Sequence, residues 1–157
     1  ACEDPFQEIT KFQLLKAVSP GDAFVINVSR VEKRRVFSVE GFEILFVKKK
    51  DEKGVVWEVL FPARKAKEGQ AFQLPGGVKA ILLRKGMPQV MEVSKPLSPQ
   101  YFDRHGEMAL PPYIQKQRSQ RHTCREDSQW YQTAWGREWG SCASPTASLH
   151  FQKEDLE

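Results

Sequence analysis

The residues best suited to do chemistry lie near the C-terminal end of the chain. His150 stands between two apolar residues in the segment 145–151. An imidazole at such a place can move a proton near neutral pH. It can equally be a core histidine whose two nitrogens are hydrogen-bonded locally. The spacing alone leaves these two interpretations open.

A basic stretch, residues 115–125, precedes this segment and contains no acidic residue. Such a run can neutralise nucleic-acid phosphates, although its charge alone favours a solvated loop. The whole chain of 157 residues carries only +4, from 24 basic and 20 acidic residues, which permits an anionic partner without requiring one. The basic members are Lys116, Arg118, Arg121 and Arg125.

Aromatic residues flank the basic stretch on both sides. Trp130 and Tyr131 could stack on a base, but we favour a core role for both. The run Pro111-Pro112-Tyr113 is interpreted as a rigid polyproline-type corner rather than a recognition element.

The sequence does not support a metal site, a phosphate-binding loop or a membrane span. Cys2, Cys124 and Cys142 are an odd number of cysteines without close pairing, which favours free thiols and a reducing cytoplasm. His122 and Cys124 with Cys142 could donate to zinc, but they lack the paired close ligands of structural zinc sites, so we expect no metal. Residues 75–77 lack the spacing of a phosphate loop and predict a turn. No apolar run approaches the ~18 residues of a membrane span.

The elements that position these residues begin with a predicted helix. Asp4 is its expected N-cap and Pro5 its first residue, and the turn at residues 19–22 ends it. Residues 23–28 are rich in β-formers and predict a strand. Apolar residues recur near helical spacing at Phe6, Ile9, Phe12, Leu15 and Val18.

Residues 33–97 predict a small antiparallel β-barrel, because short β-forming runs alternate with Gly, Pro and Lys clusters. Gly41 divides the first run as a turn or bulge. A short helix is expected at residues 100–105, followed by loops. A last helix is expected with Thr146 as its cap. The β-forming runs cover residues 36–47, 55–61, 71–73, 79–83 and 87–93.

Four segments, taken in chain order, resemble the motifs of one family. Residues 20–31 read Pro-Gly-Asp-Ala-Phe-Val-Ile-Asn-Val-Ser-Arg-Val, and residues 110–114 read Leu-Pro-Pro-Tyr-Ile. Residues 131–133 read Tyr-Gln-Thr, and residues 145–151 read Pro-Thr-Ala-Ser-Leu-His-Phe. All four are similar to motifs of the S-adenosylmethionine:tRNA ribosyltransferase-isomerases of queuosine biosynthesis.

The resemblance implies an α+β, mostly β fold in which a small antiparallel β-barrel is inserted into a larger α/β domain. Residues 33–97 would be the barrel, and residues 1–32 and 98–157 would be parts of the larger domain. It also implies a cytoplasmic enzyme, which we expect to be a monomer. Its substrates would be S-adenosylmethionine, as ribosyl donor, and tRNA bearing 7-aminomethyl-7-deazaguanine. The absent initiator Met and the abrupt end predict a piece of a longer protein.

Roles for single residues follow from the same resemblance. His150 would carry the proton removed from the ribose carbon beside the sulfonium. Tyr113 and Tyr131 would offer faces to the sulfonium or to adenine. Thr146 and the backbone after Pro145 would hold the ribose hydroxyls or the methionine end.

The remaining roles concern the tRNA. Asn27 and Arg30 suit an anion or a base edge, since arginine presents a planar fork of donors. The basic stretch would contact the tRNA backbone through Lys116, Arg118 and Arg121.

The chain departs from the family pattern at several positions. Val28 and Ser29 stand where the family has Asp-Thr, Ser144 and Ser148 replace Ala and Gly, and Trp130 replaces Arg. The lost carboxylate favours an alternative, a non-catalytic RNA-binding barrel module; an inactive fragment is the other alternative. The retained segment 145–151 favours the enzyme.

Overall fold

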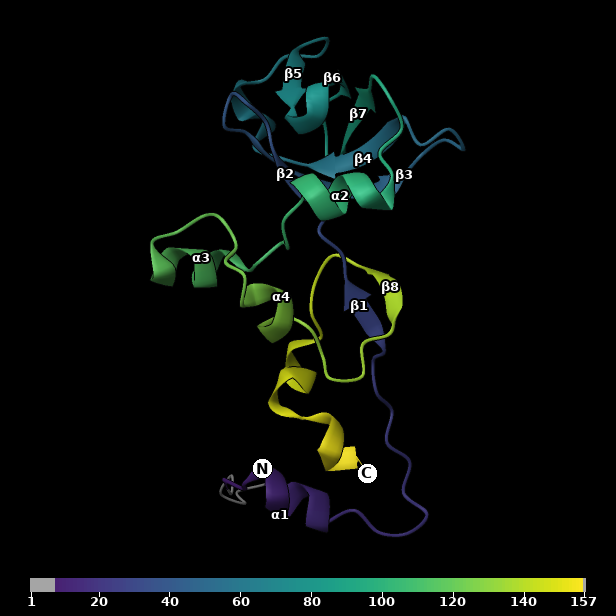
Figure 1. The fold of residues 1–157 in the computed structure, drawn as a ribbon, viewed down its shortest axis with the longest axis vertical. Coiled ribbons are helices and arrows are strands. Elements are labelled where there is room, and N and C mark those ends of the chain that lie inside the picture. The colour runs from purple at the N-terminus through teal and green to yellow at the C-terminus, as the bar shows by residue number, and fades with distance from the viewer. Residues whose placement is uncertain (1–7, 157) are drawn as a thin grey trace, which may run out of the picture.

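The barrel that the strand spacing predicts forms one end of the elongated molecule (Figure 1). In the computed structural model, which describes residues 8–156, six strands follow the order β2-β3-β4-β7-β6-β5, and all neighbours are antiparallel. The strands are β2 (Arg35–Phe37), β3 (Glu43–Lys49), β4 (Val56–Leu60), β5 (Ala71–Leu74), β6 (Val78–Arg84) and β7 (Gln89–Val93). The mostly β class is therefore confirmed.

The two edges of this sheet approach each other, so the barrel is nearly closed. Beyond β2, the Val39 N–H donates to the Gln73 carbonyl at 2.7 Å, and the Gln73 N–H donates to the Glu40 carboxylate at 3.0 Å. The turn expected at Gly41 is confirmed, with a φ of 82° that favours glycine. Short 3-10 helices occupy two connections, η1 (Ala63–Lys65) and η2 (Pro75–Gly77).

The barrel core is aromatic, and helix α2 (Pro99–His105) completes it. Phe46, Trp57 and Phe72 are at most 1% exposed. Phe102 of α2 meets Phe46 and Trp57 edge-on, each pair with ring centroids 5.6 Å apart. The helix starts one residue before the predicted range because Ser98 caps it, accepting a hydrogen bond from the Tyr101 N–H.

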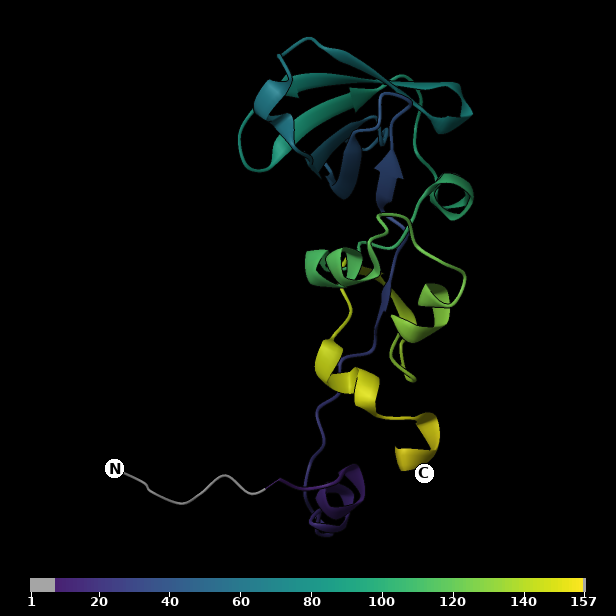
Figure 2. The ribbon, with the colours of Figure 1, turned by 90° about the vertical axis from the view of Figure 1, so that its left-hand side faces the viewer.

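The middle of the molecule holds a two-stranded parallel sheet, in which β1 (Ser29–Val31) pairs with β8 (Glu138–Ser141) (Figure 1). Helix α1 and the chain's last turn, η4, lie at the end far from the barrel (Figure 2). Lys11 and Asp155 join them in an ion pair of 2.8 Å. The helices of this part are α1 (Lys11–Lys16), α3 (Pro112–Arg118), α4 (Asp127–Trp130), η3 (Thr146–His150) and η4 (Lys153–Leu156).

Of two predictions for the N-terminal part, one falls on residues that the structure does not describe and the other is wrong. The expected helix start at Asp4 and Pro5 lies outside the described residues, and within them the helix begins at Lys11. Thr10 and Gln13 form a capping box there. The strand predicted for residues 23–28 is wrong, because this segment is irregular and Val25 is 96% exposed.

Two predictions for the C-terminal part also change. Pro111 has polyproline dihedrals, φ −54° and ψ 142°, but Pro112 begins helix α3, so the predicted corner extends over one residue only. The last predicted helix is present as η3. Thr146 is its first residue and makes no capping hydrogen bond, and Leu149 and Phe151 are half-buried. Across residues 8–156, no helix has the length and apolar character needed to cross a bilayer.

Candidate substrate site around the second core

A second, smaller hydrophobic core lies between the barrel and the chain ends, and all four family-like segments contribute to it. Val31 ends the first segment, Leu110 begins the second, Tyr131 begins the third and Leu149 belongs to the fourth. We call this cluster the second core. Its members are Val31, Met108, Leu110 and Tyr131, with Ile114 and Leu149 packed against them.

A polar contact also joins two of these segments beside the second core. Gln132 links the third segment to the first, because its side-chain amide hydrogen-bonds to both the N–H and the carbonyl of Val31. Its Nε2 donates to the Val31 carbonyl at 2.9 Å, and the Val31 N–H donates to its Oε1 at 2.9 Å. The side chain thus takes the place of a neighbouring strand beside β1.

Tyr131 and Tyr113 are neighbours with different roles. Tyr131 is 7% exposed, which confirms the core interpretation. The pKa of its hydroxyl is raised, mainly by burial and also by nearby Tyr113. A hydrogen bond with the Ser144 backbone lowers that pKa only in part. Tyr113 is 64% exposed, so of this pair it offers the free ring face. The core interpretation of Trp130 is wrong, since that side chain is 63% exposed.

Three buried polar atoms without a partner among the described residues lie in or next to the third and fourth segments. Thr133 Oγ1, Trp135 Nε1 and Ser144 Oγ have no hydrogen-bond partner in the described part of the chain. Such groups in a native fold call for a water or a ligand. Of these residues, Trp135 lines a cleft of about 120 Å³, together with Ser148, Phe151 and others.

His150 lies at the end of η3 and is exposed, so it is not a core histidine. Thr146, at the start of η3, is also exposed, and Pro145 before it is half-buried. A wide cleft of about 600 Å³ lies next to the segment, lined by Trp130, Phe151 and others, and His150 is not among its lining residues.

Asn27 and Arg30 are positioned by β1. The Asn27 Oδ1 accepts a hydrogen bond from the Ser29 N–H at 2.8 Å, and this local turn starts the strand. Arg30 is exposed, and its guanidinium lies 4.7 Å from the centre of the Trp139 ring. It therefore faces β8 rather than η3.

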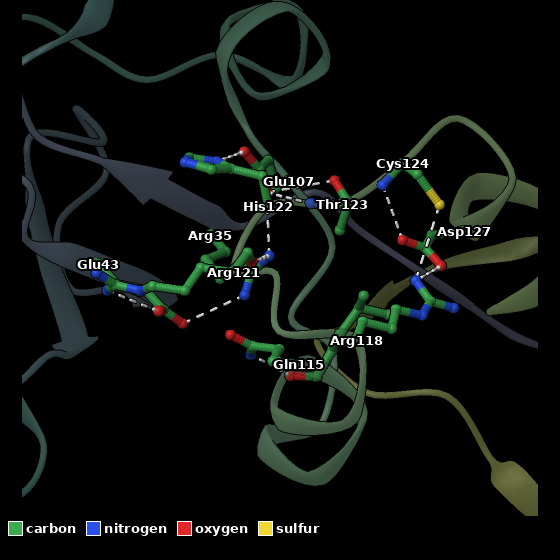
Figure 3. Close-up of polar contacts among 11 residues, drawn as sticks. Arg35, Glu43, Glu107, Gln115, Arg118, Arg121, His122, Thr123, Cys124 and Asp127 are labelled. Carbon is green, nitrogen blue, oxygen red and sulfur yellow. Dashed lines mark hydrogen bonds and ion pairs between the residues drawn. The ribbon is translucent and has the colours of Figure 1, made fainter.

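A buried arginine joins the barrel to the basic stretch (Figure 3). Arg35 is 1% exposed, and its Nη2 donates to Glu107 at 3.0 Å and to the Arg121 carbonyl at 2.9 Å. Glu107 also accepts from the Thr123 N–H at 2.8 Å and lies 2.6 Å from the His122 Nδ1. We call Arg35 and Glu107 with these contacts the Arg35–Glu107 hub.

The hub sets the charge state of its carboxylate. Burial raises the pKa of Glu107, but hydrogen bonds from His122 and Thr123 and the charge of Arg35 outweigh it, so the pKa is lowered. The barrel edge is tied down as well, because the backbones of Arg35 and Glu107 exchange hydrogen bonds of 2.7 and 3.0 Å. The first part of the basic stretch belongs to helix α3, and the rest is an exposed loop, as its charge predicts, that the hub anchors to the barrel.

The three basic residues predicted to contact tRNA differ in their surroundings. Arg118 donates to Asp127 at 2.6 Å, and Arg121 to Glu43 at 3.3 Å, so both are engaged within the chain (Figure 3). Lys116, on α3, is exposed. Asp127 has a side chain only 2% exposed, and although burial raises its pKa, the Arg118 hydrogen bond contributes to an overall lowering.

The candidate zinc ligands contact different residues. His122 is held by Glu107, Cys124 lies beside Asp127, and Cys142 is half-buried with its sulfur 4.0 Å from the Phe46 carbonyl. Within the described residues, no group of three His, Cys, Asp or Glu side chains could hold a metal ion.

Comparison with known proteins shows the family to which the chain belongs. The chain matches the family model described as queuosine biosynthesis protein over residues 3–157, and it belongs to that family. Three curated relatives carry the name S-adenosylmethionine:tRNA ribosyltransferase-isomerase.

The relative from Acetivibrio thermocellus is 36% identical, with 92% of this chain and 42% of the relative covered. Those from Pelobacter propionicus and Treponema denticola are 33% and 30% identical, with 88% and 92% of this chain and 41% and 44% of the relatives covered. The chain therefore spans less than half the length of these relatives. A solved S-adenosylmethionine tRNA ribosyltransferase from Thermotoga maritima is 24% identical, with a TM-score of 0.41 over 68% of this chain and 40% of that one.

Proposed function

We propose that this chain is part of an S-adenosylmethionine:tRNA ribosyltransferase-isomerase. The enzyme would transfer the ribosyl part of S-adenosylmethionine to 7-aminomethyl-7-deazaguanine in tRNA, form epoxyqueuosine and release adenine and methionine. The observation that carries the proposal is the convergence of four family-like segments on the second core. A cytoplasmic monomer, with residues 33–97 as the inserted domain between two parts of a larger one, completes the proposal.

The residues near η3 fit the chemistry that S-adenosylmethionine requires as a substrate. Its sulfonium makes the hydrogens on the adjacent ribose carbon acidic, so a base must accept one. His150 is exposed and free to serve as that base. The exposed ring of Tyr113 suits the sulfonium cation, while buried Tyr131 supports it from the second core.

The hydroxyls of the segment would hold the donor in place. Thr133 and Ser144 are buried, their hydroxyls have no hydrogen-bond partner among residues 8–156, and they suit the ribose hydroxyls or the methionine carboxylate. Thr146 and the backbone after Pro145 offer further polar groups at the start of η3. Ser148, which lines the cleft of about 120 Å³, stands where the family has Gly.

The tRNA would lie along the basic stretch. Lys116 is exposed, and the side chains of Arg118 and Arg121 are 35% and 60% exposed despite their ion pairs. These groups can contribute a salt-sensitive attraction to phosphates. Asn27 and Arg30, at the start of β1, would contact a base edge or a phosphate.

Adenine release tests the proposal. This chain, and the longer protein that contains it, are incubated with S-adenosylmethionine and tRNA bearing 7-aminomethyl-7-deazaguanine, and free adenine is quantified by chromatography. We expect adenine from the longer protein, and His150→Ala should lower the rate about 10²-fold or more, the range of general base catalysis. His105→Ala, on α2, is the matched control and should leave the rate unchanged.

No adenine from either protein would overturn the transferase proposal. Salt-dependent RNA binding without adenine release would instead support the non-catalytic RNA-binding module. In that binding series, Lys116→Gln should reduce the slope of log affinity against log salt by about 1.

A further inference from the structure

A stacked cation and aromatic ring lie at the junction between the barrel and the β1–β8 sheet. Trp139 is opposite Arg30 in the register of the two strands, and the Arg30 guanidinium lies 4.7 Å from the centre of the Trp139 ring. The indole is nevertheless 60% exposed. A large aromatic side chain left open to solvent beside a cation is a typical platform for a flat, electron-rich ring.

Two clefts share this ring as a wall. One, of about 230 Å³, lies toward α2, where Pro99 and Phe102 line it. The other, of about 210 Å³, lies toward the second core, where Met108 and Gln132 line it. Both clefts are lined by Lys33, Asp103 and Trp139.

The charges around the ring are suited to a nucleotide. Arg34 is engaged by Glu32 through two hydrogen bonds of 2.9 Å and lies over the Phe102 ring. Among the described residues, no carboxylate pairs with Arg30 or Lys33, so both remain available for a phosphate. Asp103 is exposed and can accept a hydrogen bond from a base amino group.

We propose that the Trp139 site, defined as Arg30, Lys33, Asp103 and Trp139, binds one unpaired nucleotide of an RNA strand. The base stacks on the indole, and the two cations hold its phosphate. An RNA strand is favoured because two clefts continue on either side of one ring, which gives the flanking nucleotides room. A duplex does not fit this chemistry, because its bases are already stacked on one another. The proposed function supplies only the identity of the RNA as tRNA.

Fluorescence anisotropy of a labelled single-stranded RNA 12-mer, titrated with the complete 157-residue chain, tests the site. Trp139→Ala should weaken binding about 5- to 150-fold, the range of one base stacked on an aromatic side chain. Trp139→Phe should recover most of the affinity. The matched control is Trp130→Ala, which removes a tryptophan that is 63% exposed, and it should change affinity less than about twofold. A duplex of the same sequence should show no dependence on Trp139.

Unchanged affinity in Trp139→Ala, with an unchanged thermal melt, overturns the site, as does an equal loss in Trp130→Ala. A further titration uses S-adenosylmethionine alone. If it displaces the RNA and loses its own binding in Trp139→Ala, the site takes the adenine of the substrate, and the RNA assignment is wrong. Failure of adenine release with Trp139-dependent RNA binding intact rejects the proposed function and leaves this site standing.

Discussion

The Glu107→Gln substitution tests whether the Arg35–Glu107 hub holds the basic stretch against the barrel. The change removes the negative charge but keeps the size and an amide oxygen. Arg35, 1% exposed, would then retain only the Glu43 carboxylate, at the longer distance of 3.4 Å. A buried cation would lose its nearer counter-charge.

The expected loss follows from the burial of the two partners. Breaking a fully buried ion pair by removing one member costs about 3–5 kcal/mol. The Glu107 side chain is 21% exposed, and glutamine can still accept a hydrogen bond from Thr123. We therefore expect the free energy of unfolding to fall by about 2 kcal/mol. For a chain of this size the melting temperature should fall by about 4–8 °C.

The same variant has a defined pH signature. Because the fold lowers the pKa of Glu107, the contribution of its carboxylate is fully present above the unfolded value of about 4.3. It is lost as the pH falls through the lower, folded pKa. The difference in stability between wild type and Glu107→Gln should therefore be constant near pH 7 and shrink below pH 4.

Urea and thermal unfolding, followed by circular dichroism, measure these differences. The control is Glu43→Gln, whose side chain is 28% exposed and 3.4 Å from Arg35, and it should cost about 1 kcal/mol or less. Equal losses in the two variants would refute the hub as the stronger contact. So would a loss in Glu107→Gln that stays constant down to pH 3.

Three further predictions concern Gly106, Gln132 and Cys142. Gly106→Ala would place its Cβ 2.0 Å from the Lys33 carbonyl oxygen, so we expect loss of more than about 3 kcal/mol or failure to fold, measured by urea unfolding. Gln132→Ala should cost about 1–3 kcal/mol and speed hydrogen exchange of the Val31 amide, because two hydrogen bonds to β1 are lost; unchanged exchange would contradict this role. Burial raises the pKa of the Cys142 thiol, so it should react with a disulfide reagent at pH 7.5 far more slowly in the folded chain than in urea, in a variant whose other cysteines are serine.

The barrel could be predicted because its strands carry their own signal. In β4 and β6, buried and exposed side chains alternate between bounding turns. The predicted strand at residues 23–28 shows the limit of composition, since β-forming residues without a partner strand stay irregular. The start of α1 could have been predicted from the sequence, because Thr10 and Gln13 have the spacing of a capping box.

The site was only partly predictable, because its contacts join distant parts of the chain. β8 has no alternating pattern, and it forms only because β1 lies beside it. The Arg35–Glu107 hub joins residues 72 positions apart, and nothing local to either marks the pairing. The four family-like segments could be found by their resemblance, whereas their meeting in the second core required the fold.

Because β1 pairs with β8, the two-stranded sheet cannot form until late in the synthesis of the chain. The barrel core uses residues between Val36 and Phe102, all of which are translated before β8. At about 5–20 residues per second, β1 waits roughly 5–20 seconds for its partner strand. The barrel residues are themselves translated during that interval, and once the barrel has folded it holds one end of β1 until Glu138–Ser141 arrives to cover the polar edge.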